Sequence, residues 1–336
     1  MPVTVPASPA LSAAAQTALF ARQRSGWTGG DATYSTVLPD GRIAWAFGDT
    51  FLNGITRDGS RSLDEKTVVR NSIVSQSGNT LTTHTGSDGK DAIDFLLPPG
   101  SRINRNGRAA DPWYWPGDMV NAGNDVILFM NRYVSGKDPA AEWFHRGTDV
   151  VRLDAATLQP RSVTPMSGPE SGIIWGAALA QSDGHVYIYG SEDRQSRKHL
   201  HVARTTPDDI DQRWEYWTGT SWSGDASRSA RLGPEVSNQF GVVQAADGWR
   251  LLTQQGVGQD IVSYRAPTPY GPFSDPQVVA TIPVQPNHRH GYNALPHPEL
   301  SRDGRLLISY NVSGADLFSD HRSYRPRFME IPSSAL

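Results

Sequence analysis

The 336-residue chain contains no cysteine, which excludes disulfide bonds, thiol catalysis and zinc sites built on cysteine. No run of eighteen apolar residues occurs, so we expect no helix that crosses a membrane. Only 19% of the residues are charged, the formal net charge is −3, and no basic block is present that could bind nucleic acid. These absences leave a globular protein whose partner is neither a nucleic acid nor a membrane.

Turn-forming and aromatic residues are abundant instead. The chain has 32 Gly, 24 Pro, 10 Trp, 11 Tyr and 10 Phe. Glycine and proline favour turns, and aromatic side chains supply much apolar area per residue, a balance typical of all-β proteins. The only helix that the sequence predicts covers residues 9–23, with Ser8 as its cap and Pro9 in the first turn.

A β-hairpin recurs five times along the chain. Each copy has a strand, a tight turn, and a second strand that is richer in β-branched and aromatic residues, which is a strong short-range signal for a hairpin. The turns are Asp40-Gly41, Asn124-Asp125, Asp183-Gly184, Asp247-Gly248 and Asp303-Gly304. They are 56 to 85 residues apart, and each interval is long enough for a four-stranded sheet.

This repeat predicts an all-β fold, a five-bladed β-propeller formed by a single domain. We expect residues 26–336 to form the catalytic propeller and residues 1–25 to be an N-terminal segment that closes it. The alternative is a β-sandwich with accidental Asp-Gly turns. Five similar hairpins in register are difficult to place in a sandwich.

Strand polarity predicts where polar side chains gather. In a propeller the first strand of a blade starts on the face where the second strand ends, so residues that open the first and close the second share one rim. Asp31 and Asp118 open first strands, and Asp49 and Glu192 close second strands. We expect Asp31, Asp49 and Asp118 to be catalytic, although each could also stabilise a turn, and Glu192 could be a solvated loop residue.

Several carboxylates at one rim suit glycoside hydrolysis. Neighbouring carboxylates raise each other's pKa, so that one stays protonated as an acid while another is a base. Hydrolysis of a glycosidic bond needs that pair, and aromatic faces and amides suit a sugar ring and its hydroxyls. The predicted substrate-binding residues are Trp115, Trp175, Asn238, Gln239, His290, Tyr292 and Asn293, with core packing as the alternative for the aromatic ones.

Several segments resemble a known family. Trp27-Thr28-Gly29-Gly30-Asp31 and Trp45-Ala46-Phe47-Gly48-Asp49-Thr50 resemble the opening of the endo-D-arabinanases of glycoside hydrolase family 183, and the likeness continues in Trp115-Pro116-Gly117-Asp118 and Trp175-Gly176-Ala177-Ala178. Tyr292-Asn293-Ala294 is shared more widely by propellers that act on arabinan. The resemblance extends over nearly the whole chain.

The resemblance implies cleavage of internal arabinofuranosyl linkages in D-arabinan, as in arabinogalactan or lipoarabinomannan. Asp31 and Asp49 would be the essential carboxylates, Asp118 a third member, and the outcome inversion. No cofactor or metal is required, although an ion such as calcium in the channel is one expectation. We further expect a secreted monomer. An exo-acting arabinofuranosidase and a non-catalytic glycan-binding propeller remain the alternatives.

Overall fold

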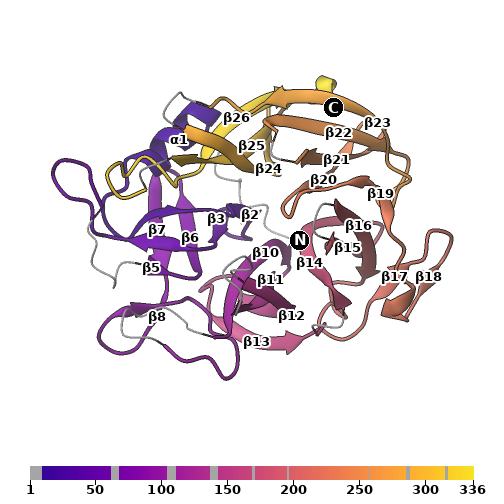
Figure 1. Ribbon diagram of the computed structural model, residues 1–336, viewed down its shortest axis with the longest axis horizontal. Helices are drawn as coiled ribbons and strands as arrows, with labels where there is room; N and C mark the ends of the chain where they lie inside the picture. Colours follow the sequence, from indigo (N-terminus) through magenta and orange to yellow (C-terminus); the bar gives the residue numbers. More distant parts are fainter. Residues whose placement is uncertain are drawn as a thin grey trace.

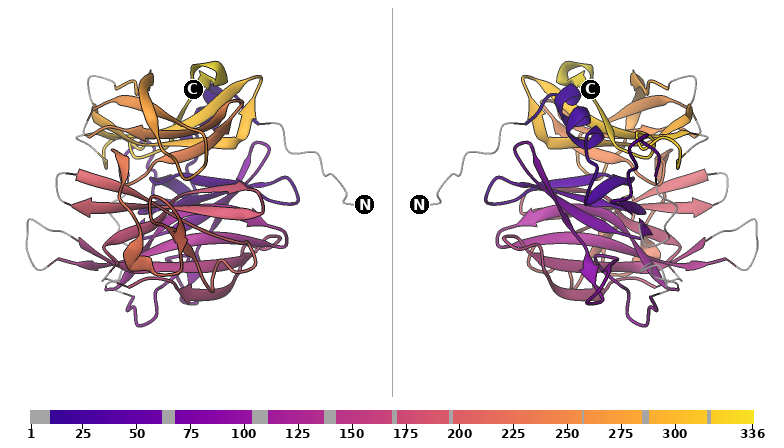
Figure 2. Two further views of the ribbon diagram at one scale, coloured as in Figure 1. Left: turned by 90° about the vertical axis from the view of Figure 1, so that its right-hand side faces the viewer. Right: turned by 90° about the vertical axis from the view of Figure 1, so that its left-hand side faces the viewer.

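The protein is a five-bladed β-propeller, as the sequence predicts. The computed structural model describes residues 10–61, 68–103, 111–136, 143–168, 171–194, 197–256, 258–284, 288–314 and 317–336. Five antiparallel sheets surround a central axis, and the chain passes through them in sequence order (Figure 1). The side views show the sheets stacked around the ring in a thick disc (Figure 2).

Each blade is built outward from an inner strand. The first blade contains β2 (Tyr34–Val37), β3 (Ile43–Phe47), β6 (Ser72–Ser77) and β7 (Thr80–His84). The second contains β10 (Trp113–Ala122), β11 (Asp125–Ser135), β12 (Trp143–Asp154) and β13 (Pro160–Pro165). The fourth contains β20 (Gly241–Ala245), β21 (Gly248–Gln254), β22 (Asp260–Ala266) and β23 (Ser274–Thr281).

Two blades depart from four strands. The third contains β14 (Ile173–Ser182), β15 (His185–Arg194), β16 (Arg197–Thr205), β17 (Glu215–Trp217) and β18 (Trp222–Ser223), and β19 (Leu232–Glu235) also pairs with β16. The fifth contains β24 (His288–Arg302), β25 (Arg305–Gly314) and β26 (Arg327–Pro332). Two small sheets lie outside the blades, one of β1 (Trp27–Gly30), β4 (Thr50–Leu52) and β5 (Val68–Val69), the other of β8 (Gly86–Ser87) and β9 (Ala92–Ile93).

All five predicted hairpins are present. The turns join β2 to β3, β10 to β11, β14 to β15, β20 to β21, and β24 to β25, and each of these pairs is antiparallel. In every blade the predicted turn therefore connects the innermost strand to the second one. Local turn chemistry was sufficient to locate the centre of each blade.

The N-terminal helix packs on the last blade. Helix α1 spans Ala13–Ala21, so within the described residues the predicted range of 9–23 was too long at both ends. The predicted cap Ser8 and Pro9 lie outside the described residues, and the observed cap is Ser12, which accepts a hydrogen bond from the Ala15 N–H. The main-chain N–H of Phe328 in β26 donates to Thr17 Oγ1 at 3.0 Å. The first and last described parts of the chain thus meet at the fifth blade (Figure 1).

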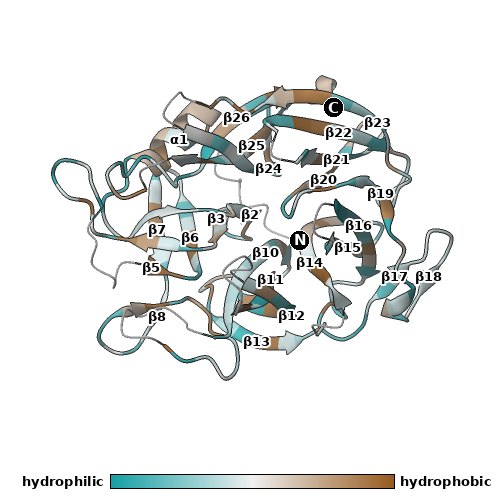
Figure 3. Ribbon diagram, in the orientation of Figure 1, coloured by the Kyte–Doolittle hydropathy of each residue, from teal (hydrophilic) through white to brown (hydrophobic). Residues whose placement is uncertain are grey.

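Hydrophobic clusters fill the spaces between neighbouring blades. One of them joins the first and second blades through Tyr34, Ile73, Leu128 and Val151, all of which are buried. Hydrophobic residues concentrate on the strands, and many connecting loops are hydrophilic (Figure 3). In the part of the chain that the structure describes, no helix has the length and apolar character needed to cross a membrane.

Candidate active site

A short strand pair outside the first blade places Asp31 beside Asp49. Strands β1 and β4 are antiparallel, with Gly30 opposite Thr50. Asp31 directly follows β1 and Asp49 directly precedes β4, so the pairing aligns the two residues. The Gly48 N–H also donates to the Asp31 carbonyl at 2.9 Å. Two residues eighteen positions apart in sequence are thereby fixed as neighbours.

The backbone around Asp31 is strained. Ala32 and Thr33 have φ angles of 77° and 55°, in the left-handed region that is unfavourable for alanine and for β-branched threonine. On the opposite side, a Cβ at Gly48 would lie 3.0 Å from Asp31 Oδ1, so glycine leaves room for the carboxylate. Strain of this kind persists where the surrounding structure over-determines it, which is common at functional sites.

The two carboxylates line one cavity at a mouth of the propeller. Its volume is about 560 Å³, and its walls come from the first, second, third and fifth blades and from the segment before β20. The lining residues that carry polar or aromatic groups are Asp31, Tyr34, Asp49, Arg70, Trp113, Trp115, Asn131, Tyr133, Ser135, Trp143, Asn238, Gln239, Tyr292, Asn293 and Tyr324.

Asp31 is held so that it retains its proton near neutral pH. Burial raises the pKa of Asp31 from its ordinary value of 3.8 to about 7, and the charge of Asp49 acts in the same direction. Hydrogen bonds from Tyr324 and Tyr292 favour the ionised form but only in part offset the effect. The Tyr292 hydroxyl lies 3.3 Å from Asp31 Oδ2.

Asp49 lies in a different electrostatic environment. The indole N–H of Trp115 donates to Asp49 Oδ1 at 3.0 Å, and the Arg70 guanidinium lies 3.5 Å from both carboxylate oxygens. The guanidinium also stacks over the Trp113 ring, 4.1 Å from its centroid. A cation and an N–H donor both interact best with an ionised carboxylate. The two carboxyl groups therefore have different partners: burial and tyrosine hydroxyls surround Asp31, whereas a guanidinium and an indole N–H contact Asp49.

One wall of the cavity is aromatic. Trp115 lies 5.6 Å from Trp113, 4.8 Å from Tyr133 and 5.3 Å from Trp143, measured between ring centroids. Trp115 was predicted to stack on a sugar, and the structure places it at the centre of this wall, directly beside Asp49.

The cavity is also lined by most of the predicted polar residues. Tyr292, Asn293, Asn238 and Gln239 all line it. The side-chain oxygen of Gln239 is buried and has no hydrogen-bond partner among the described residues. A buried acceptor without a partner is available to a ligand hydroxyl.

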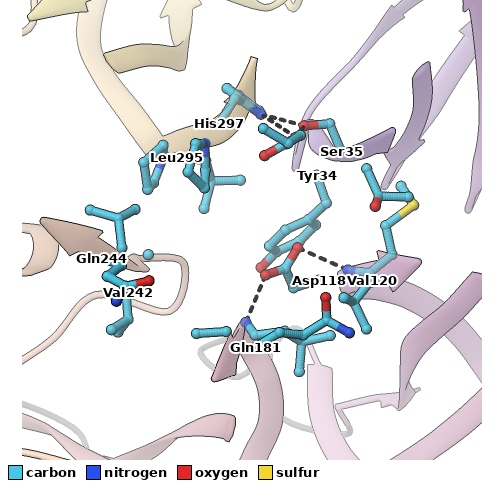
Figure 4. Close-up of a pocket in the computed structure, with 18 of the residues that line it drawn as sticks. Tyr34, Ser35, Asp118, Val120, Gln181, Val242, Gln244, Leu295 and His297 are labelled. Atoms are coloured by element: carbon cyan, nitrogen blue, oxygen red, sulfur yellow. Dashed lines mark hydrogen bonds and ion pairs between the residues drawn. The ribbon is translucent and has the colours of Figure 1, made fainter. Parts of the chain in front are cut away.

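Asp118 does not line this cavity. It lies in a second cavity of about 390 Å³ along the central channel, where it accepts hydrogen bonds from the Leu179 and Met119 N–H groups at 2.7 and 2.8 Å (Figure 4). Burial raises the pKa of Asp118 to about 8. Tyr34 lines both cavities and its hydroxyl lies 3.4 Å from the Ala177 carbonyl, so this side chain stands between the mouth and the channel.

Two further predictions need correction. Trp175 is 1% exposed and packs in the third blade against Trp214 and Tyr216, so core packing explains it. The register shift in β14 between Trp175 and Ala178 turns Ala177, instead of Trp175, toward the cavity. His290 is exposed, bonds to Ser313 at 3.1 Å and is not among the residues that line the cavity.

Glu192 also lies outside the mouth cavity. It is buried and bonds to the Arg231 guanidinium and, at 3.3 Å, to His201. Among the described residues, no group of three or more His, Asp and Glu side chains is arranged to hold a metal ion.

Three important residues that line the mouth cavity were not predicted from the sequence. Arg70 lies after β5, Tyr324 lies in the segment before β26, and Trp143 opens β12. The aromatic character of Tyr324 and Trp143 was visible, but nothing local indicated that their segments reach the mouth. Nothing in the local sequence around Arg70 marked it as a residue of the site.

Comparison by sequence identifies one family. A family profile described as "Domain of unknown function (DUF5005)" matches residues 15–333. No curated protein matches the chain.

Comparison by structure finds propellers. A protein from Bacteroides ovatus, described as a candidate hydrolase, superposes with a TM-score of 0.77 and 25% sequence identity, covering 95% of this chain and 89% of that one. A family 43 β-xylosidase/α-arabinofuranosidase from a compost microbial metagenome gives a TM-score of 0.54 at 13% identity, covering 92% and 94% of the two chains. A family 43 enzyme of Xanthomonas citri, in complex with xylotriose, gives 0.53 at 14% identity, covering 94% and 93%.

Proposed function

The chain belongs to the DUF5005 family, and we propose that it is a glycoside hydrolase that cleaves internal arabinofuranosyl linkages of D-arabinan. The observation that carries the proposal is the pairing of a carboxylic acid, Asp31, with a carboxylate, Asp49, in one aromatic-walled cavity. Glycoside hydrolysis requires both groups at one bond. The solved glycosidases with the same architecture make a sugar substrate the natural class to test.

In this proposal Asp31 is the general acid. A carboxyl with a pKa of about 7 is protonated over the acidic and neutral range, and it can donate that proton to the leaving oxygen as the bond to the anomeric carbon breaks. Tyr292 and Tyr324 hold the carboxyl in place and stabilise the charge that forms when the proton leaves.

Asp49 then serves as the base. Arg70 and the Trp115 indole orient its carboxylate, so it can accept a proton from water that attacks the anomeric carbon. The new C–O bond forms from water, the glycosidic C–O bond breaks, and the two protons move to Asp49 and to the leaving oxygen. This is the inverting route, which the resemblance to arabinan-active propellers suggests. Proton NMR of the first product anomer tests it.

The choice of D-arabinan rests on the sequence segments around Asp31 and Asp49 that resemble the endo-D-arabinanases. A secreted enzyme that needs no cofactor fits a polymeric substrate of this kind. The products of a polymer digest separate the alternatives: a ladder of oligosaccharides supports endo cleavage, and release of monosaccharide alone supports an exo-acting arabinofuranosidase.

The pH profile tests which carboxylate is the acid. With Asp31 as acid, kcat/KM on D-arabinan should fall as the pH rises through about 7, because the required proton is lost. If Asp31 were the base, the same titration would make activity rise with pH. A rising limb near pH 7 would therefore reverse the assignment.

Two matched variants test the pair itself. Asp31→Asn and Asp49→Asn should each reduce activity on the polymer by about 10²–10⁴-fold, the range that acid–base catalysis supplies. On an aryl arabinofuranoside with a good leaving group, which needs little proton donation, Asp31→Asn should recover much of its activity and Asp49→Asn should not. If both variants keep full turnover, Asp31 and Asp49 are not the catalytic pair. If the wild type binds the glycan but does not cleave it, the protein is a glycan-binding propeller and the hydrolase proposal is wrong.

A further inference from the structure

Trp143 is an exposed aromatic residue at the edge of the candidate active site. It opens β12 and is 48% exposed, yet it lines the same cavity as Asp31 and Asp49. A large apolar side chain kept half in water at the rim of a cavity is an arrangement typical of binding sites. The proposed hydrolysis does not by itself need this residue.

Trp143 and its neighbour Phe144 are similarly exposed, but strand geometry places their side chains on opposite faces of β12. Side chains alternate across a strand, so Trp143 and His145 lie on one face of β12, and Phe144 and Arg146 on the other. The contacts agree, because the His145 ring lies 5.5 Å from Tyr133, which lines the cavity, while the Arg146 guanidinium lies 5.8 Å from the Phe144 ring. Phe144 is 44% exposed and does not line the cavity.

Trp143 continues the aromatic wall outward from the reacting groups. Its ring lies 5.3 Å from that of Trp115, with an angle of 83° between the planes, and the Trp115 indole is bonded to Asp49. Because the two rings are nearly perpendicular, they do not stack face to face, and half of the Trp143 surface stays open. One side chain thus separates Trp143 from the carboxylate.

We propose that Trp143 forms a distinct sugar-binding subsite, which holds a pentose unit of the substrate chain next to the units at the cleaved bond. This inference rests on the proposed function and deepens it. The C–H face of a sugar covers the exposed indole, and apolar area now in water becomes buried. Because the subsite lies beyond the carboxylates, only a substrate long enough to reach it gains this contact. Trp143 therefore makes the protein favour chains over single sugars.

The test compares Trp143→Ala with Phe144→Ala, two neighbouring truncations of exposed aromatic residues. Activity is measured on arabino-oligosaccharides of increasing length and on an aryl arabinofuranoside that carries one sugar. Trp143→Ala should lower kcat/KM on the long chains by about 5–30-fold, the factor expected for loss of one aromatic contact, with little change on the aryl substrate. Phe144→Ala should match the wild type on both, and Trp143→Phe should restore most of the loss.

Binding measurements distinguish failure of the proposed subsite from failure of the proposed hydrolase activity. Calorimetric titration with the same oligosaccharides needs no turnover, so it reports on Trp143 even if the wild type proves inactive. Weaker binding of long chains to Trp143→Ala but not to Phe144→Ala supports the subsite. The inference is overturned if Trp143→Ala affects all substrate lengths equally, if both variants lose the same affinity, or if the wild type binds no arabino-oligosaccharide.

Discussion

Two aspartates of identical chemistry differ in this protein because of their immediate neighbours. Asp31 is buried and close to another carboxylate, and these two effects favour its neutral form more than the hydrogen bonds from Tyr292 and Tyr324 favour its ionised form. Asp49 instead contacts the Arg70 guanidinium and the indole N–H of Trp115. Neither property belongs to the residue itself. The division of labour between acid and base follows from which side chains the fold brings to each one.

We expect the buried Asp31 carboxyl to lower the free energy of unfolding of the wild type at neutral and higher pH. The folded protein keeps the Asp31 proton up to about pH 7, whereas the unfolded chain releases it near pH 3.8, so the wild type loses stability as the pH rises between these values. Asp31→Asn avoids the buried charge and should be more stable than the wild type by about 1–3 kcal/mol at pH 8. A tenfold change in an acid dissociation constant corresponds to about 1.4 kcal/mol, and water in the cavity screens part of the effect.

Urea unfolding at pH 4 and pH 8 checks this expectation. The gain should vanish at pH 4, and Asp208→Asn, a change on an exposed turn, should show no difference at either pH. A stabilisation of Asp31→Asn that is the same at both pH values would show that charge is not its cause.

Irregular inner strands shape the mouth of the propeller. The register of β10 shifts between Pro116 and Met119, that of β14 between Trp175 and Ala178, and that of β24 between Tyr292 and Leu295. Ala177 and Asn293 lie inside their shifts and Pro116 lies at the edge of its shift, and all three line the mouth cavity. Extra residues of this kind bend a strand and redirect its side chains.

Two glycines with similar φ angles allow the cost of backbone strain to be distinguished from the cost of close packing. Gly176 and Gly184 have φ angles of 77° and 75°, but an added Cβ at Gly176 would lie 2.4 Å from the buried Phe129 ring, and one at Gly184 would meet nothing within 4 Å. Gly176→Ala should therefore cost about 2–5 kcal/mol, from backbone strain plus overpacking. Gly184→Ala should cost only the strain, about 1–2 kcal/mol.

The free energy of unfolding in urea measures both glycine variants. Similar losses for Gly176→Ala and Gly184→Ala would mean that the close approach to Phe129 is not important for stability.

At the scale of the whole molecule, the helix α1 packs on the last blade, where the two ends of the described chain meet. The Arg325 guanidinium donates to the carbonyls of Phe20 and Gln23, each at 2.7 Å. Phe20 itself is fully buried among the rings of Trp27, Trp45 and Phe328, with centroid distances of 5.1 to 5.8 Å. These contacts join the two ends of the described chain, and closure of the propeller by the N-terminal segment stays a prediction.

Truncation of Phe20 tests the importance of this closure. Phe20→Ala should reduce the free energy of unfolding by about 3–5 kcal/mol, the usual cost of removing a buried aromatic ring. Ala18→Ser, on the exposed side of the same helix, should cost a few tenths of a kcal/mol by helix propensity. Differential scanning calorimetry compares the two. A Phe20→Ala protein as stable as Ala18→Ser would show that the ring closes without the helix.

The sequence by itself determined the five hairpins, the propeller and the proximity of Asp31 to Asp49, because these depend on local turn chemistry and on strands adjacent along the chain. Only the tertiary structure decided that Trp175 is core, that Asp118 belongs to the channel, and that Arg70, Trp143 and Tyr324 reach the mouth. The reason is physical: a single extra residue in a strand exchanges its two faces, and residues from distant blades meet only once the ring has closed.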